Sequence, residues 1–305
     1  MERVITINRT LRGEDDIRAF VSECEQSLEK QMDDAAAYFL ASEGNHYVAL
    51  SGPTCAGKTT TARKLIEDFG ASKRTIRRIS LDDFFVSRSV LEQRAKEEGG
   101  DPDFESVKAI DLEYLRECVD AIQQEKTVLL PVYSFLEGKR TEYIPFEPKT
   151  DDIVIFEGIQ AIYPEFIELF PKGTLKSIHI TVNSDLVYNG IRFDRREIRL
   201  MRRLVRDYRF RGASPSLTFT MWKGVVENED RNILPYEKNA DIHIDSLMPY
   251  ELHLLRDPLT AVLNQLEKDS EYYPQALRLM EKIAPFEPIG EEYLPANSLY
   301  HEFLG

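Results

Sequence analysis

The chain has 305 residues, of which 42% are hydrophobic, so it can bury the core of one large α/β domain or of two smaller ones. Its net charge of −14 argues against a general nucleic-acid-binding protein, whose affinity depends on cations that neutralise phosphates. The cysteines, at positions 24, 55 and 118, are too few and too scattered for a disulfide framework or a zinc site. There is no apolar run of membrane-spanning length and no signal-peptide core, so we expect a cytoplasmic protein with no nucleic-acid and no membrane partner.

The chain is predicted to begin with an acidic amphipathic helix over residues 14–42, because apolar residues recur there at helical spacing. Strands are then expected at 47–51, 76–80, 127–130, 153–156, 176–182 and 241–244, and helices at 58–69, 111–124, 164–170, 184–211, 215–228 and 249–267. This alternation predicts an α/β fold with a mostly parallel sheet and helices on both faces. We divide the chain into an N-terminal helical segment packed on the core (1–44), a central domain (45–268), and a C-terminal helix and tail (269–305).

A phosphate-binding loop follows the first of these strands. The stretch from Gly52 to Thr59 fits the pattern G-x-x-x-x-G-K-[ST], and it lies between an apolar run and a helical pattern, as the motif requires. Lys58 is expected to bridge the β- and γ-phosphates, and the Thr59 hydroxyl to bind Mg²⁺. The sequence therefore predicts a P-loop NTPase type of fold, with ATP bound by Gly52, Pro53, Thr54, Cys55, Ala56, Gly57, Lys58, Thr59 and Thr60.

Two carboxylates, Asp82 and Asp83, follow the next strand. A carboxylate at this end of a parallel sheet can take the proton of an attacking hydroxyl and help to position a metal. A further apolar strand, 153–156, ends in Glu157-Gly158, which is typical of a Walker B element whose acid lies near Mg²⁺. An acidic turn and a strand capped by a solvated acid are the plainer alternatives for these two signals.

The segment from Arg192 to Arg211 contains nine arginines and three acidic residues in an otherwise acidic chain. Several arginines share one helical face, and guanidinium groups suit phosphate, so we expect an Arg-rich helical lid over the triphosphate. A solvated face laced with ion pairs is the alternative.

These signals, in this order, resemble the uridine kinase family within the uridine kinase/phosphoribulokinase group of P-loop kinases. The resemblance covers about residues 45–265 and includes an acidic substrate segment (103–105), a Pro-x-Tyr-x-Phe element (131–135) and an Arg-rich lid. The closing residues, 298–305, are similar to the C-terminus of bacterial uridine kinase-like proteins.

The resemblance implies roles for particular residues. Asp82 matches the catalytic base for a sugar hydroxyl, and Glu105 matches an acid that holds the ribose hydroxyls. Tyr133, Phe135 and Arg140 match positions that line or flank the nucleobase pocket. For neutralising the charge on the transferred group, our first choices in the Arg-rich lid are Arg202 and Arg206. A histidine that reads the base in pyrimidine-nucleoside kinases is replaced here by Gly138.

We therefore expect a nucleoside kinase-like enzyme that uses ATP and Mg²⁺ and acts on a small hydroxylated molecule. The sequence is compatible with a homo-oligomer as well as with a monomer. One alternative is a nucleotide-binding regulatory protein with little catalysis, and another is a kinase for a different small metabolite. A guanine-nucleotide switch is disfavoured because the sequence has no [NT]-K-x-D motif.

Overall fold

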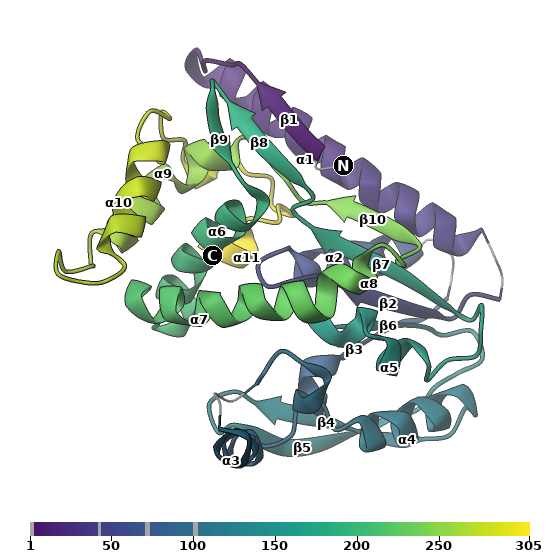
Figure 1. Cartoon of the computed structure of the whole chain (residues 1–305). Helices are drawn as coiled ribbons and strands as arrows, with labels where there is room; N and C mark the ends of the chain where they lie inside the picture. Colours follow the sequence, from purple (N-terminus) through teal and green to yellow (C-terminus); the bar gives the residue numbers. More distant parts are fainter. Residues whose placement is uncertain (1–2, 42–43, 71–73, 100–102) are drawn as a thin grey trace.

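A five-stranded parallel sheet forms the centre of the molecule (Figure 1). The computed structural model describes residues 3–41, 44–70, 74–99 and 103–305. In spatial order the central strands are β10 (Ile242–Asp245), β7 (Leu175–Thr181), β2 (Tyr47–Ser51), β6 (Ile153–Glu157) and β3 (Ile76–Ser80). The prediction of a P-loop fold with a mostly parallel sheet is confirmed.

The helices surround this sheet (Figure 1). They are α1 (Gly13–Leu40), α2 (Lys58–Gly70), α3 (Arg88–Glu98), α4 (Leu112–Gln123), α5 (Pro164–Ile167), α6 (Arg195–Arg211), α7 (Pro215–Asn228), α8 (Leu234–Glu237), α9 (Glu251–Leu263), α10 (Tyr273–Ile283) and α11 (His301–Leu304). Short 3₁₀ turns cover Leu81–Phe84, Val107–Ala109, Ile159–Ile162 and Glu291–Tyr293, and a π-helical turn, Glu229–Ile233, links α7 to α8.

The expected strand at 127–130 does not join the central sheet. It forms β4 (Val128–Ser134), which pairs antiparallel with β5 (Lys139–Phe146), a strand that the sequence reading missed. This hairpin lies with α3 and α4 at one end of the molecule, far from α9 and α10 (Figure 1). The 3₁₀ turn after β3 contacts β4, so the hairpin is held next to the end of β3.

The predicted helix over 184–211 is wrong in its first part. Residues 184–193 form an antiparallel hairpin of β8 (Ser184–Tyr188) and β9 (Ile191–Phe193). Asn189 and Gly190 connect the two strands with φ angles of +48° and +82°, which is the backbone that an Asn-Gly hairpin turn prefers. The helix α6 begins only after Asp194, whose carboxylate accepts hydrogen bonds from the backbone N–H groups of Arg196 and Glu197.

The N-terminal segment contributes a strand as well as a helix. β1 (Arg3–Ile7), which was not predicted, pairs parallel with β8 and completes a small second sheet. Helix α1 contacts α2 and β10, and its buried side chains, Phe20 and Phe39 among them, belong to the main apolar core. The expected helix ended at residue 42, and that position lies outside the described residues.

Candidate active site

The loop between β2 and α2 has the backbone geometry of an anion cradle. Cys55 and Gly57 have φ angles of +57° and +94°, so the chain turns back on itself before α2 begins. A Cβ atom on Gly52 would lie 2.2 Å from the carbonyl oxygen of Ile180, so only glycine allows the loop to leave β2 this close to β7. The predicted ATP-binding residues 52–60 therefore lie together at the carboxyl edge of the sheet, at the N-terminus of α2.

Lys58, Thr59 and Glu157 meet at this edge because β2 and β6 are neighbouring parallel strands. The Lys58 ammonium donates to the carbonyl oxygen of Pro53 at 3.1 Å, which folds the side chain back over the loop. The Thr59 hydroxyl donates to Glu157 Oε1 at 3.1 Å. Arg78, which the sequence reading did not single out, donates to the other oxygen of Glu157 at 2.9 Å and fixes the carboxylate.

A magnesium ion fits this pair of oxygen atoms. Mg²⁺ commonly keeps several waters and binds one or two protein oxygens together with phosphate oxygens. The Thr59 hydroxyl and the Glu157 carboxylate are hydrogen-bonded neighbours beside the cradle, so both oxygens can serve one ion. In the part of the chain that the structure describes, no group of three or more His, Cys, Asp or Glu side chains forms a metal site by itself, so the phosphates would have to supply further ligands.

The two aspartates after β3 have different environments. Asp83 accepts a hydrogen bond from the backbone N–H of Tyr133 at 3.0 Å and so ties the β4–β5 hairpin to the sheet. Among the described residues, none donates a hydrogen bond to the Asp82 carboxylate. The structure therefore distinguishes an aspartate that holds the hairpin from one whose carboxylate has no hydrogen-bond donor among the described residues.

Asp82 lies near Glu157 because the turns that follow β3 and β6 pack closely together. A Cβ atom on Gly158 would lie 2.7 Å from Cβ of Leu81, so the glycine after Glu157 lets the turn that carries Asp82 approach. Burial raises the pKa of Asp82, the ammonium of Lys58 opposes the rise, and the carboxylate of Glu157 adds to it. Asp82, Glu157 and Lys58 are therefore close enough at the cradle for their charges to affect one another.

Glu105, in the segment before the 3₁₀ turn Val107–Ala109, is also close enough to Lys58 and Asp82 to be affected by their charges. Its backbone oxygen accepts hydrogen bonds from Gln160 Nε2 at 3.3 Å and from the Tyr163 hydroxyl at 3.0 Å. Burial raises the pKa of Glu105, and the cations of Arg203 and Lys58 oppose the rise. Gln160 and Tyr163 were missed by the sequence reading; they follow Glu157 by only a few residues, which places them at the same strand end.

An aromatic cluster lies beside these acids. The rings of Tyr133 and Phe135 are 5.2 Å apart, and the ring of Phe85 is 5.7 Å and 6.1 Å from them. The Phe135 side chain is 58% exposed, so its ring is open to a ligand. Arg140 is engaged elsewhere: it donates to the backbone oxygen of Phe84 at 2.9 Å and pairs with Asp111 at 3.0 Å.

Gly138 stands at the tip of the β4–β5 hairpin with a φ angle of +66°. A Cβ atom there would lie 2.9 Å from Cβ and 3.1 Å from Nε of Arg88. The Arg88 guanidinium donates to the backbone oxygen of Phe135 at 2.7 Å. Arg88 of α3 therefore packs against the position at which pyrimidine-nucleoside kinases have a histidine.

Two arginines of α6 hold the phosphate loop from behind. Arg199 donates to the backbone oxygen of Thr54 at 3.3 Å, and Arg202 donates to that of Cys55, also at 3.3 Å. Arg202 is fully buried and forms a bidentate pair with Glu251 at 2.7 and 2.9 Å. The structure therefore does not place Arg202 where our sequence prediction needed it, because its donors are committed to protein acceptors.

Three other arginines surround the buried Asp207. Arg206 donates to Asp207 Oδ1 at 2.9 and 2.6 Å, Arg203 donates to Oδ2 at 3.1 Å, and Arg211 lies 3.6 Å from Oδ1. The buried Nη1 atom of Arg203 has no hydrogen-bond partner among the described residues. Asp207 therefore aligns a row of cations, and Arg203 and Arg211 also lie close enough to lower the pKa of Glu105 and of Asp82, respectively.

Known proteins include relatives of this chain. The model of the Phosphoribulokinase / Uridine kinase family matches residues 47–252. The uridine kinase of Halobacterium salinarum is 25% identical over 241 residues, which cover 75% of this chain and 97% of that protein. The uridine kinase of Clostridium novyi is 30% identical over 200 residues, covering 65% of this chain and 85% of that protein.

Among solved structures, a possible uridine kinase from Bacillus stearothermophilus aligns with a TM-score of 0.49 at 16% sequence identity. The alignment covers 72% of this chain and 99% of that one. In the described residues, no helix combines the length and the apolar character needed to cross a bilayer.

Proposed function

Because the chain belongs to the Phosphoribulokinase / Uridine kinase family, we propose that it is an ATP-dependent kinase that transfers the γ-phosphate to a hydroxyl group of a nucleoside. The proposal is supported above all by the position of Asp82, a carboxylate without a hydrogen-bond donor among the described residues, close to Lys58 and Glu157. A base in that position can serve a hydroxyl that attacks a phosphate bound in the cradle.

In the proposed reaction the acceptor oxygen attacks the γ-phosphorus while its proton passes to the Asp82 carboxylate. A new oxygen–phosphorus bond forms, the bond between the γ-phosphorus and the β–γ bridging oxygen breaks, and ADP leaves with the bonding electrons. Because burial raises the pKa of Asp82, its carboxylate is a stronger base than an exposed aspartate. Glu105, on the acceptor side, would bind the sugar hydroxyls.

The negative charge of the transferred group would be neutralised by Lys58 and Arg206. We add Arg203, because its Nη1 atom is buried without a partner among the described residues. We assign Arg202 a structural role instead, since it holds the loop through the Cys55 oxygen and pairs with Glu251. Mg²⁺, held by Thr59 and Glu157, would supply further positive charge beside the phosphates.

The acceptor side differs at one position from the pattern of pyrimidine-nucleoside kinases. Phe135 offers exposed aromatic surface to a flat or apolar group, and Tyr133 packs beside it as a buried residue. Arg140 holds the hairpin through Phe84 and Asp111. With Gly138 in place of a base-reading histidine, a hydrogen bond that would discriminate between bases is lost. This favours a second candidate, a kinase for another small hydroxylated metabolite.

An acceptor screen tests the proposal. The purified protein is incubated with ATP and Mg²⁺ and with a panel of nucleosides, pantothenate and ribulose phosphate, and ADP release and product mass are measured. Phosphorylation of a nucleoside supports the first candidate, and phosphorylation of another acceptor alone supports the second. Tight nucleotide binding without any product would instead favour a regulatory protein.

The base is tested with two neighbouring substitutions of the same kind. Asp82→Asn should keep ATP binding and lower kcat by at least about a hundredfold, because the proton acceptor is lost. Asp83→Asn is the matched control and should keep most of the activity, since its amide oxygen can still accept from the Tyr133 N–H. Near-normal turnover of Asp82→Asn would remove Asp82 from this role.

A further inference from the structure

The C-terminal segment, residues 298–305, contacts the phosphate loop at two points. The Thr60 hydroxyl, in the first turn of α2, donates to Glu302 Oε2 at 3.4 Å. Leu299 covers Gly57 so closely that a Cβ atom on that glycine would lie 2.0 Å from Leu299 Cδ1. More than 240 residues of sequence separate these partners, so neither contact follows from the local motif.

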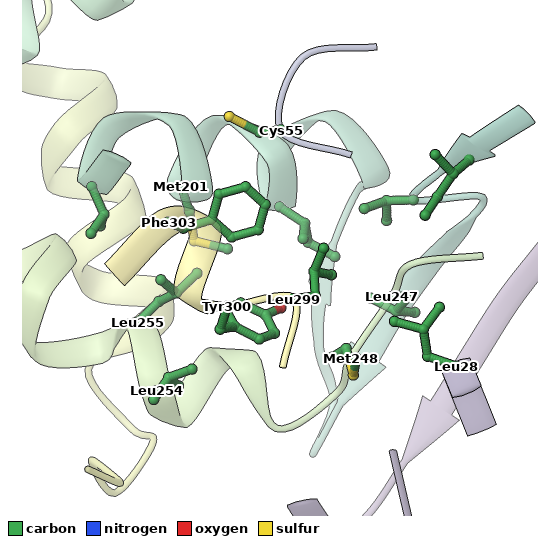
Figure 2. Close-up of a cluster of buried hydrophobic side chains, with 14 of the residues drawn as sticks. Leu28, Cys55, Met201, Leu247, Met248, Leu254, Leu255, Leu299, Tyr300 and Phe303 are labelled. Carbon is green, nitrogen blue, oxygen red and sulfur yellow. The ribbon is translucent and has the colours of Figure 1, made fainter. Parts of the chain in front are cut away.

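The C-terminal segment is fixed in this position by α6. The Tyr300 hydroxyl accepts a hydrogen bond from Arg202 at 3.2 Å, and the backbone oxygen of Leu304 accepts one from Arg209 at 2.5 Å. Tyr300 and Phe303 are buried in one apolar cluster with Met201 of α6 (Figure 2). The segment is thus part of the packed core, and its Glu302 carboxylate faces the first turn of α2.

The Glu302 carboxylate lies within electrostatic reach of two cations of the proposed reaction, Lys58 and Arg206. Burial raises the pKa of Glu302, and the ammonium of Lys58 and the guanidinium of Arg206 oppose the rise. A partly buried acid is costly unless cations and hydrogen-bond donors compensate it, and here the compensating groups are Thr60, Lys58 and Arg206, which belong to the proposed phosphate site. In the mechanism above this carboxylate has no part, which leaves its position unexplained.

We propose that the C-terminal segment is an integral wall of the phosphate-donor site and that Glu302 is a positioning residue for the first turn of α2, through Thr60. This inference rests on the proposed kinase function. Glu302 fixes the first turn of α2 through the Thr60 hydroxyl. Its carboxylate is also close enough to Lys58 and Arg206 for their charges to act on one another. Because small displacements of binding groups cost large factors in rate, the last residues of the chain contribute to turnover without touching substrate.

Two variants separate the two roles of Glu302. Glu302→Gln keeps an oxygen that can accept from Thr60 but removes the charge, so kcat should fall about tenfold while the KM for ATP stays near the wild-type value. Glu302→Ala removes both, so the KM for ATP should also rise about tenfold. Glu291→Gln is the matched control: it is the same substitution at an acid that pairs with Arg209 of α6, and it should leave both constants unchanged.

The result that would overturn the inference is a wild-type KM and kcat in Glu302→Ala, or tighter binding of ATP, which would show that the segment obstructs the site. Calorimetry with Mg-ATP keeps this test separate from the proposed function. If the wild-type protein phosphorylates no acceptor, the kinase proposal fails, whereas weaker ATP binding by folded Glu302→Ala still supports the C-terminal wall. Should Glu302→Ala not fold, the kcat of the near-isosteric Glu302→Gln decides, and an unchanged kcat refutes the positioning role.

Discussion

Replacing Arg202 with alanine should destabilise the protein far more than it impairs the chemical step. Arg202 and Glu251 are both fully buried, and the guanidinium makes two hydrogen bonds to that carboxylate. It also donates to the backbone oxygens of Cys55 and Ser246 and to the Tyr300 hydroxyl. Its removal leaves a buried carboxylate without its cation.

The expected loss is about 3–5 kcal/mol, because breaking a buried ion pair by removing one partner leaves an uncompensated charge. For domains of comparable size, each kcal/mol lowers Tm by about 2–4 °C, so the variant should melt on the order of 10 °C lower. Most of this loss comes from the unpaired carboxylate of Glu251. The double variant Arg202→Ala/Glu251→Ala should therefore lose clearly less free energy of unfolding than the sum of the losses in the two single variants.

The assay is urea unfolding of the wild type, the two single variants and the double variant, with kcat measured per folded molecule at a temperature where all four are folded. Arg206→Ala serves as the comparison, because Asp207 keeps Arg203 and Arg211 as partners there. A destabilisation below about 1 kcal/mol in Arg202→Ala, together with a kcat loss of a hundredfold or more, would refute this reasoning and restore Arg202 as a group that acts on phosphate.

Three further outcomes follow from the site. Arg206→Ala should lower kcat about 10²- to 10³-fold with little change in unfolding, as measured by turnover and by urea melts, because a preorganised charge is lost at the phosphates. Asp82→Asn should raise the free energy of unfolding at pH 7. Burial raises the pKa of Asp82 in the folded state, so the ionised carboxylate destabilises the wild-type protein at pH values above 3.8, the ordinary pKa of an aspartate. Urea melts should show that the stability gained by the substitution disappears below that pH. Phe135→Ala should raise the KM for the acceptor several-fold at constant stability, since the ring is 58% exposed; an unchanged KM would place the acceptor elsewhere.

The placement of side chains at the carboxyl edge of the sheet was predictable because it depends on local patterns. A glycine-rich turn between an apolar strand and a helix has few backbone solutions, and the two carboxylates at strand ends must meet when the strands are parallel neighbours. Thr59, Glu157 and Asp82 therefore lie where the sequence placed them relative to the loop. The Asn-Gly turn at 189–190 carried an equally local signal, which the helix prediction over that region overlooked.

Other features were decided only by tertiary packing. Helical periodicity places several arginines of α6 near one another, but it does not say which partner each of them binds. Only the packing shows that Arg199 and Arg202 bind carbonyl oxygens of the phosphate loop, whereas Arg203 binds Asp207. Likewise, two adjacent aspartates look alike in sequence until the hairpin N–H of Tyr133 binds one of them. The contact of Glu302 with Thr60 joins the chain's last helix to its first phosphate-binding turn. No local pattern encodes such pairings, because they depend on how distant elements pack around one core.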